Sequence, residues 1–228
     1  MTSTTPRNAS LLFLGFVSWV SLLAACAGPT AAGSKATPPP SPVATSGTTP
    51  PGRMALVADL EESRRAFLDA VKGLSEAQLL YKAAPDRWSI AEVAEHIAIA
   101  EERIFANVTE KVMQSPLTDE LRAQIQADDG RVRRTLTDRS ARRQAPETLR
   151  PTGRFPSMAD LIAAFETGRA RTLDYARNGQ VDLRAHAAPH PVLGVIDAHQ
   201  WLLVLSAHCA RHTAQILEVK ADPGYPKN

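Results

Sequence analysis

Apolar residues recur at steps of three and four along most of the chain after residue 54, and this spacing strongly constrains the fold. Residues spaced in this way share one face of a helix, which neighbouring helices can cover. No stretch alternates convincingly as a half-buried strand does, and no internal repeat is visible. The sequence therefore predicts an all-α domain over residues 54–224, with helices at about 54–73, 90–115, 158–178 and 196–219.

Two of these helices have clear start signals. Ser89 is followed three residues later by Glu92, and Ser157 by Asp160, as in a capping box. Between these helices lies a polar stretch of about forty residues, in which we expect one short helix near 118–128. We therefore expect a four-helix bundle with a long crossover between its second and third helices.

The crossover is strongly basic. Residues 131–154 contain eight arginines but only two acidic residues, whereas the whole chain has a formal net charge of +2. Such a segment could bind anionic lipid or nucleic acid, but a solvated loop is the simpler interpretation. We expect no nucleic-acid partner.

The N-terminal segment has the pattern of an export signal. Arg7 precedes an apolar run over residues 11–25, which is short for a membrane span. The run ends in Leu23-Ala24-Ala25-Cys26, which resembles the lipobox of bacterial lipoproteins. That resemblance implies a lipoprotein-type signal peptide over residues 1–26, with Cys26 as the lipidation site and the membrane as partner. An ordinary secretory signal or an uncleaved anchor are the alternatives.

Residues 27–53 are rich in proline, serine, threonine and alanine, a composition that cannot build a core. We expect this segment to be a linker that holds the domain away from the bilayer. The protein would then lie in the cell envelope, anchored outside the cytoplasmic membrane. Because Ala27 rather than aspartate follows Cys26, the lipoprotein resemblance implies the outer membrane in a two-membrane bacterium.

Two histidines on the last predicted helix suggest a metal site. His208 and His212 are four residues apart, so both rings lie on the same helix face, within the apolar stripe. Imidazoles that face a core are costly unless bonded, and one metal ion would satisfy both. The alternative is two histidines bonded to carbonyls or water. His96, at the edge of the second helix's stripe, is the candidate third ligand.

Two longer stretches resemble a known family. Residues 88–96 resemble the "W-S-x-x-E-x-x-x-H" stretch of the DinB-like family, and residues 208–216 resemble its "H-x-x-R-H-x-x-Q-I" stretch. Residues 145–151 and 190–194 also look like segments of this family. The resemblance implies a four-helix bundle that is often dimeric. It further implies a divalent metal ion, zinc or nickel among others, held by His96, His208 and His212.

Three neutral histidines leave a coordination position open, where a bound water or thiol could ionise. We therefore expect a metal-dependent hydrolase or transferase of unknown small-molecule substrate. Some relatives transfer low-molecular-weight thiols, but these are mainly cytosolic, which weakens that interpretation for an exported protein. The alternative is a non-catalytic metal-binding or interaction module.

Other residues near the predicted ligands have simpler explanations. Glu92 could act as a base, but its place in the capping box favours a structural role. Cys209 points about 100° away from His208, so we expect a core residue rather than a ligand, and no disulfide with Cys26. Gln215 could orient a ligand or make a plain polar contact. We expect Trp88 to plug one end of the bundle. The remaining histidines are expected at the surface or in loops, namely His186, His190 and His199.

Overall fold

The computed structural model describes residues 51–140 and 143–227. The predicted signal peptide, Cys26 and the linker up to residue 50 lie outside the described residues. The described part is mostly helical, as the apolar spacing predicts. Its four long helices are α1 (Pro51–Val71), α3 (Ile90–Glu110), α6 (Met158–Asn178) and α7 (Ala198–Lys220).

Shorter elements connect the long helices. Three are α-helices and three are single turns of 3₁₀-helix, and a two-stranded antiparallel sheet precedes α7. They are α2 (Glu76–Leu80), η1 (Val112–Gln114), α4 (Asp119–Gln124), α5 (Asp129–Thr137), η2 (Glu147–Leu149), η3 (Leu183–Ala185), β1 (Ala187–His190) and β2 (Gly194–Asp197).

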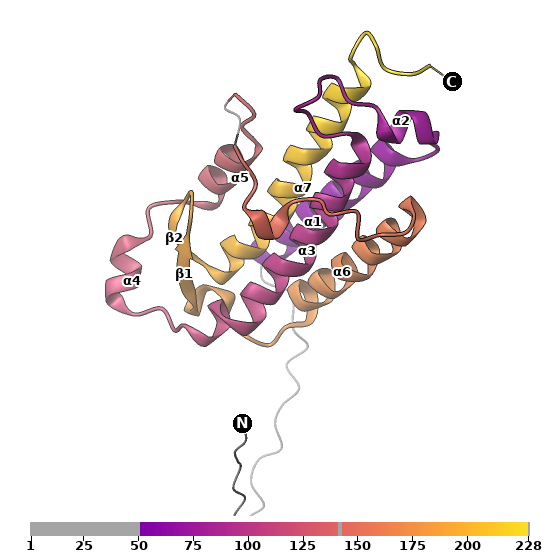
Figure 1. The fold of residues 1–228 in the computed structure, drawn as a ribbon. Coiled ribbons are helices and arrows are strands. Elements are labelled where there is room, and N and C mark those ends of the chain that lie inside the picture. The colour runs from indigo at the N-terminus through magenta and orange to yellow at the C-terminus, as the bar shows by residue number, and fades with distance from the viewer. Residues whose placement is uncertain (1–50, 141–142, 228) are drawn as a thin grey trace, which may run out of the picture. The chain divides into compact units, whose positions relative to one another are not determined.

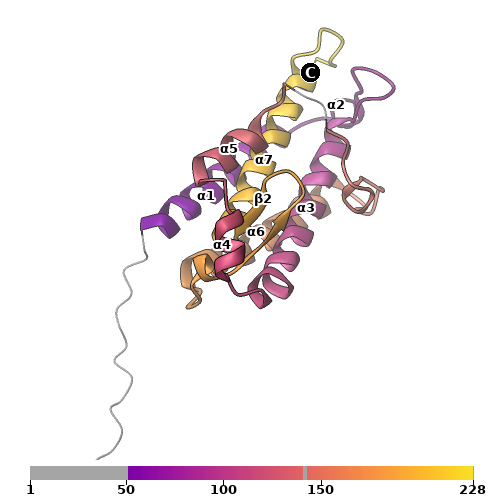
Figure 2. The same cartoon turned by 90° about the vertical axis from the view of Figure 1, so that its left-hand side faces the viewer.

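Each long helix packs against two others. Helices α1 and α3 both contact α6 on one side and α7 on the other, and α5 lies along α7 (Figures 1 and 2). Apolar side chains fill the interior in two clusters. One is formed around Leu60 and Leu202, and the other around Phe67, Ile90 and Phe165. No helix of the described part is both long and apolar enough to cross a bilayer.

The predicted capping signals are confirmed. Ser89 Oγ accepts a hydrogen bond from the Glu92 amide, and Glu92 Oε2 accepts one from the Ser89 amide at 2.7 Å. Ser157 Oγ likewise accepts from the Asp160 amide at 3.1 Å. These bonds satisfy amide donors that the first helical turn leaves free, so the two helices begin where the sequence predicts.

The first helix begins earlier than predicted, at Pro51 rather than at Met54. Proline is tolerated in the first turn of a helix because the amide it lacks would have no partner there. A proline-rich composition therefore did not mark the end of the linker.

The mostly helical fold also contains a small two-stranded sheet that the sequence pattern does not predict. Ala187 pairs with Asp197 and His190 with Gly194, in strands of four residues each. Such strands are too short to show alternation, and Pro189 weakens the pattern further. The last helix consequently begins at Ala198, after the capping residue Asp197, and not at Ile196.

The basic crossover is not simply a solvated loop. It contains α5, capped by Asp128, whose Val132 and Leu136 are buried against the bundle. Arg133 on this helix forms an ion pair with Asp59 of α1. Two buried apolar residues among many arginines gave too weak a pattern for the sequence to predict this helix.

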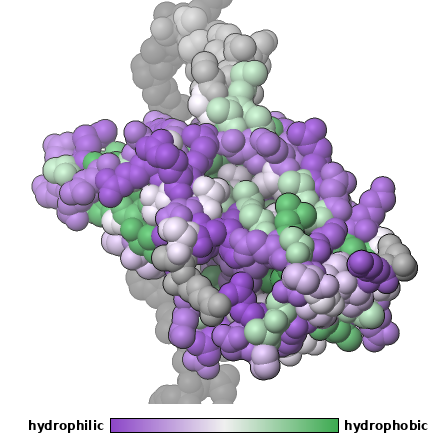
Figure 3. Space-filling model, turned by 90° about the horizontal axis from the view of Figure 1, so that it is seen from above, coloured by the Kyte–Doolittle hydropathy of each residue, from purple (hydrophilic) through white to green (hydrophobic). Residues whose placement is uncertain are grey.

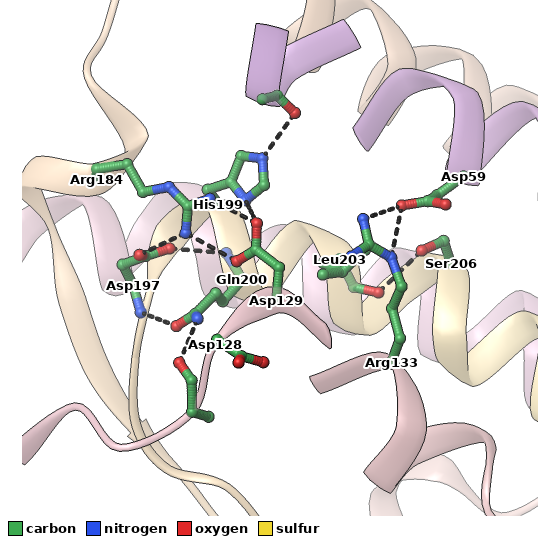
Figure 4. A network of polar contacts seen from close by, with 12 residues as sticks. Asp59, Asp128, Asp129, Arg133, Arg184, Asp197, His199, Gln200, Leu203 and Ser206 are labelled. Atoms are coloured by element: carbon green, nitrogen blue, oxygen red, sulfur yellow. Dashed lines mark hydrogen bonds and ion pairs between the residues drawn. The ribbon is translucent and has the colours of Figure 1, made fainter. Parts of the chain in front are cut away.

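The expectation that His199 lies at the surface or in a loop was also wrong. It lies in the first turn of α7 and is only 3% exposed. Its Nε2 is 3.0 Å from the carbonyl oxygen of Gly52, and its Nδ1 is 3.7 Å from Asp129 Oδ2 (Figure 4). Arg184 bonds both carboxylate oxygens of Asp129 and also reaches Asp197. This network joins the starts of α1, α5 and α7.

A second polar group lies in the middle of the bundle. Arg169 of α6 is fully buried and contacts both carboxylate oxygens of Glu101 on α3, at 3.0 and 2.8 Å. Its Nη1 also donates to the Leu60 carbonyl and to Ser63 Oγ on α1. Gly168 allows this approach, because a Cβ atom there would lie 3.1 Å from Glu101 Cγ. One guanidinium thus connects three helices.

The surface has a different character from this interior. On the face seen in Figure 3, hydrophilic residues predominate and hydrophobic ones form small patches between them. The large apolar residues that are exposed come from separate helices and loops, namely Met54, Leu80, Val181, Val192 and Leu217.

Candidate metal centre

The structure brings the three predicted ligands together. His96 comes from α3, and His208 and His212 come from adjacent turns of α7, which packs against it. His96 Nε2 lies 3.1 Å from His208 Nε2 and 3.2 Å from His212 Nε2. All three ligand atoms lie within 4.8 Å of one another, close enough to hold one metal ion.

In two of the rings, the hydrogen-bond partner of the outer nitrogen determines which ring nitrogen carries the proton. His96 Nδ1 is 2.6 Å from the Leu149 carbonyl oxygen, and His212 Nδ1 is 2.9 Å from Gln215 Oε1. Because an oxygen of this kind only accepts, each Nδ1 must donate and each Nε2 must present a lone pair. The bond to Gln215 therefore holds the His212 ring in one orientation.

This arrangement fits a metal ion. Two lone pairs that face each other at 3.2 Å repel unless a cation lies between them. Imidazole nitrogens that share one zinc ion in tetrahedral geometry, with bonds of about 2.0–2.1 Å, lie about 3.3 Å apart. The spacing from His96 to each of the other two rings is close to that value. A hydrogen bond to the outer nitrogen is also the usual support of a metal-bound histidine.

The environment keeps the rings neutral. Burial lowers the pKa of His96, and it lowers the pKa of His212 to about 3. The pKa of His208 is lowered well below its ordinary value by burial and then by its electrostatic interaction with the nearby His212 and His96 rings. Neutral imidazole is the form that binds metal, so the cluster is ready to accept a cation at pH 7.

The crossover is held over the cluster by a residue that the sequence analysis missed. Glu95 accepts hydrogen bonds from the backbone amides of Thr152, Gly153 and Arg154, at 2.9–3.1 Å. These bonds fix the segment that follows Leu149, whose carbonyl binds His96. Glu95 precedes His96 directly, but its polarity alone did not distinguish it from a surface residue.

Glu92 has the structural role that its sequence position favours. Its Oε2 accepts from the Ser89 amide, and its Oε1 forms an ion pair with Lys82 at 2.8 Å. Among the described residues, the candidate metal group consists of the three histidines and does not include Glu92.

The other residues singled out by the sequence lie around the cluster. Cys209 is 1% exposed and close to the Ser63 carbonyl, and burial raises the pKa of its thiol to about 11, so the core interpretation is confirmed. Trp88 packs 5.0 Å from the His96 ring, measured between centroids. His190 ends β1 and packs 4.9 Å from Trp201, and His186 immediately precedes β1.

Comparisons with known proteins identify the family of the region that contains the three histidines. The family model described as the DinB superfamily matches residues 59–216, which include all three histidines. The chain is also similar to the uncharacterized protein YuaE of Bacillus subtilis (strain 168). The two are 24% identical over 159 residues, which cover 70% of this chain and 93% of that protein.

Proposed function

The chain belongs to the DinB superfamily, and on that premise we propose that it is a metal-dependent hydrolase or transferase acting on a small molecule. His96, His208 and His212 hold the divalent ion, which we propose to be zinc or nickel. We further propose that α1, α3, α6 and α7 form the four-helix bundle with a long crossover that is expected for this family.

The observation that carries this proposal is a cluster of three nitrogen ligands, two of which belong to partly exposed residues. His208 and His212 are only partly buried, and no carboxylate or thiolate joins the cluster among the described residues. Three protein ligands leave a position for a fourth partner, as in catalytic zinc sites. An ion held there would lower the pKa of a bound water or thiol toward neutrality.

The rival function is a metal-binding or interaction module without turnover. The observation that favours it is the enclosure of His96, which is 2% exposed and covered by the Trp88 ring. Turnover needs a substrate to approach the ion, whereas simple binding does not. Activity screens on the metal-loaded protein distinguish the two.

We expect the purified protein to bind about one zinc or nickel ion per chain. The physical reason is that the lone pairs on His96 Nε2 and His212 Nε2 point toward each other and repel, and a cation between them removes this repulsion. Elemental analysis after dialysis measures the stoichiometry, and a screen of ester, amide and thiol-transfer substrates follows on the loaded protein. A chain that retains no metal when refolded with zinc or nickel would contradict the proposal.

We also propose that the protein is located outside the cytoplasmic membrane, and in the outer membrane if the source bacterium has two membranes. Residues 1–26 are the signal, Cys26 carries the lipid, residues 27–50 form the linker, and the folded domain begins with α1 at Pro51. An envelope location separates the protein from cytosolic thiols and nucleic acids, so neither is its proposed partner. Two copies pair as a homodimer.

Replacing Cys26 with serine should release the protein from the membrane. Two or three acyl chains anchor a protein stably, whereas a chain without them has only weak contacts with the bilayer. Fractionation of cells that express the wild type and Cys26→Ser measures the effect, and Cys209→Ser is the matched control because its thiol is buried. Membrane attachment that persists in Cys26→Ser would overturn the lipid anchor.

A further inference from the structure

The Glu95 carboxylate lies in a small nest of backbone amides. Its Oε1 accepts hydrogen bonds from the Thr152 amide at 2.9 Å and the Arg154 amide at 3.1 Å, and its Oε2 accepts one from the Gly153 amide at 3.0 Å. Gly153 has a φ of +72°, a left-handed conformation that glycine adopts freely and that lets successive amides converge on one anion. Because Glu95 is only 6% exposed, these bonds are largely shielded from water.

The same stretch of chain supplies the acceptor of His96. Leu149 ends the single turn η2, and its carbonyl oxygen lies 2.6 Å from His96 Nδ1. Only Arg150 and Pro151 separate this carbonyl from the Thr152 amide. Arg150 is extended, with φ −70° and ψ 144°, as a residue before proline usually is, and the ring of Pro151 fixes its own φ. A stiff link of two residues thus connects the Leu149 carbonyl to the amide nest.

Other attachments of this link are weaker. Residues 150 and 152–154 are exposed, so apolar packing does not hold them. The Arg154 side chain pairs with Glu102, but the two side chains are 40% and 54% exposed, and such a pair contributes little. Phe155 packs on the apolar cluster around Phe67, but it follows the nest rather than the link. The charge-assisted bonds to Glu95 are therefore the strongest polar attachment of the link among the described residues.

We propose that Glu95 is a positioning residue of the metal centre. It holds the amide nest, and the nest and the stiff link together fix the Leu149 carbonyl. That carbonyl keeps the proton of His96 on Nδ1, so the lone pair on Nε2 faces the other two histidines. Glu95 is not itself a member of the candidate ligand group. The inference rests on the proposed function, because His96 is a proposed ligand, but its effect on the His96 ring needs no metal.

The tautomer of the His96 ring in the metal-free protein tests this role directly. The full chain is purified in detergent, isotope-labelled and stripped of metal with a chelator, and nuclear magnetic resonance of the ring nitrogens identifies the protonated one. In Glu95→Gln the side chain has no charge, and its amide nitrogen faces donors instead of accepting from them. We expect one tautomer of His96 in the wild type and a mixture of two in the variant.

The His212 ring is the internal control of this measurement. Its Nδ1 bonds to Gln215 Oε1 at 2.9 Å, on its own helix, and this bond does not involve the nest. His212 should therefore keep one tautomer in the wild type and in Glu95→Gln. A merely structural effect of the substitution would loosen both rings, whereas a positioning effect changes His96 alone.

Zinc affinity measures the consequence at the centre. Loss of an outer hydrogen-bond partner of a metal-bound histidine costs about 10–100-fold, and Glu95→Gln loosens that partner without removing it, so we expect about a tenfold weaker affinity. Glu102→Gln is the comparison variant, because Glu102 lies two turns later on α3 and bonds the side chain of Arg154 in the same nest. It should change neither the His96 tautomer nor the zinc affinity.

Gly153→Ala tests the nest from the other side. A Cβ atom there meets no atom within 4 Å, but alanine disfavours the left-handed φ, so the turn should relax and its amides should separate. This variant should behave as Glu95→Gln does. The double variant should be little worse than either single one, because both changes break the same unit. If Glu95→Gln does not fold, Gly153→Ala decides the test.

The metal-free measurement separates this inference from the proposed function. A His96 ring that keeps one tautomer in both Glu95→Gln and Gly153→Ala overturns the role of Glu95, even if zinc loads normally. Mixed tautomers of His212 as well as His96, or an equal loss of zinc affinity in Glu102→Gln, also overturn it. If the wild type binds no zinc, the proposed function fails, and a mixture of tautomers at His96 alone still supports the role of Glu95.

Discussion

A chain in which His208 is replaced by alanine should bind zinc more than about 100-fold more weakly than the wild type, because loss of even an outer hydrogen-bond partner costs about 10–100-fold. The change removes one of three nitrogens that converge within 4.8 Å. His96 Nε2 and His212 Nε2 remain, but two neutral ligands leave half of a tetrahedral ion to solvent. Competition with a chromophoric chelator measures the affinity.

The fold should survive this substitution, because His208 is only partly buried. The metal-free wild type and the metal-free variant should therefore melt at similar temperatures, while added zinc should raise the melting temperature of the wild type alone. His186→Gln is the matched control, since His186 lies outside the cluster and its loss should leave zinc affinity unchanged. Equal zinc affinity in His208→Ala and the wild type would show that the metal lies elsewhere.

The ligands could be predicted from the sequence because their signals are local or belong to a family pattern. The spacing of His208 and His212 alone places both on one helix face. No spacing rule relates His96 to them, however, because it lies on another helix. Its place at the edge of that helix's apolar stripe made it a candidate, and the family resemblance implied the same residue. The supports of the site were harder to predict. Glu95 acts through backbone amides of residues 152–154, and nothing in its own neighbourhood indicates them.

In the fold, too, features that depend on neighbouring residues could be predicted, whereas features that depend on distant residues could not. Capping pairs such as Ser89 and Glu92 lie within one turn, so the sequence predicts the helix starts they produce. The hairpin before α7 depends on pairing between strands of only four residues, and the buried position of His199 depends on α1 and α5. His190 was expected to be a loop or surface residue, and its relation to Trp201 arises only when β1 folds onto α7.

The buried ion pair of Arg169 and Glu101 is another feature that no local pattern reveals, since its partners are 68 residues apart. The guanidinium is 0% exposed, and four of its contacts are hydrogen bonds to Glu101, the Leu60 carbonyl and Ser63. Thr172 donates a further bond to Glu101 Oε1 at 2.8 Å. Burying such charges costs free energy that only a complete set of partners offsets.

Replacing Arg169 with methionine should therefore lower the free energy of unfolding by about 3–5 kcal/mol, because it leaves the Glu101 carboxylate buried without its counter-ion. Glu101→Gln should act in the same direction, and denaturant unfolding followed by circular dichroism measures both. Breaking the exposed pair of Arg177 and Glu61 with Arg177→Ala is the matched control. Its side chains are 47% and 34% exposed, so it should cost less than about 1 kcal/mol.

The double variant Arg169→Met with Glu101→Leu separates the ion pair from simple packing. Removing both charges eliminates the buried carboxylate without a partner, so the double variant should be more stable than Arg169→Met alone. It should not regain full stability, because Ser63 and Thr172 each lose one hydrogen-bond partner in the core and the Leu60 carbonyl loses its bond from Arg169. If Arg169→Met cost no more than Arg177→Ala, the pair would not hold α1, α3 and α6 together, and apolar packing alone would account for the bundle.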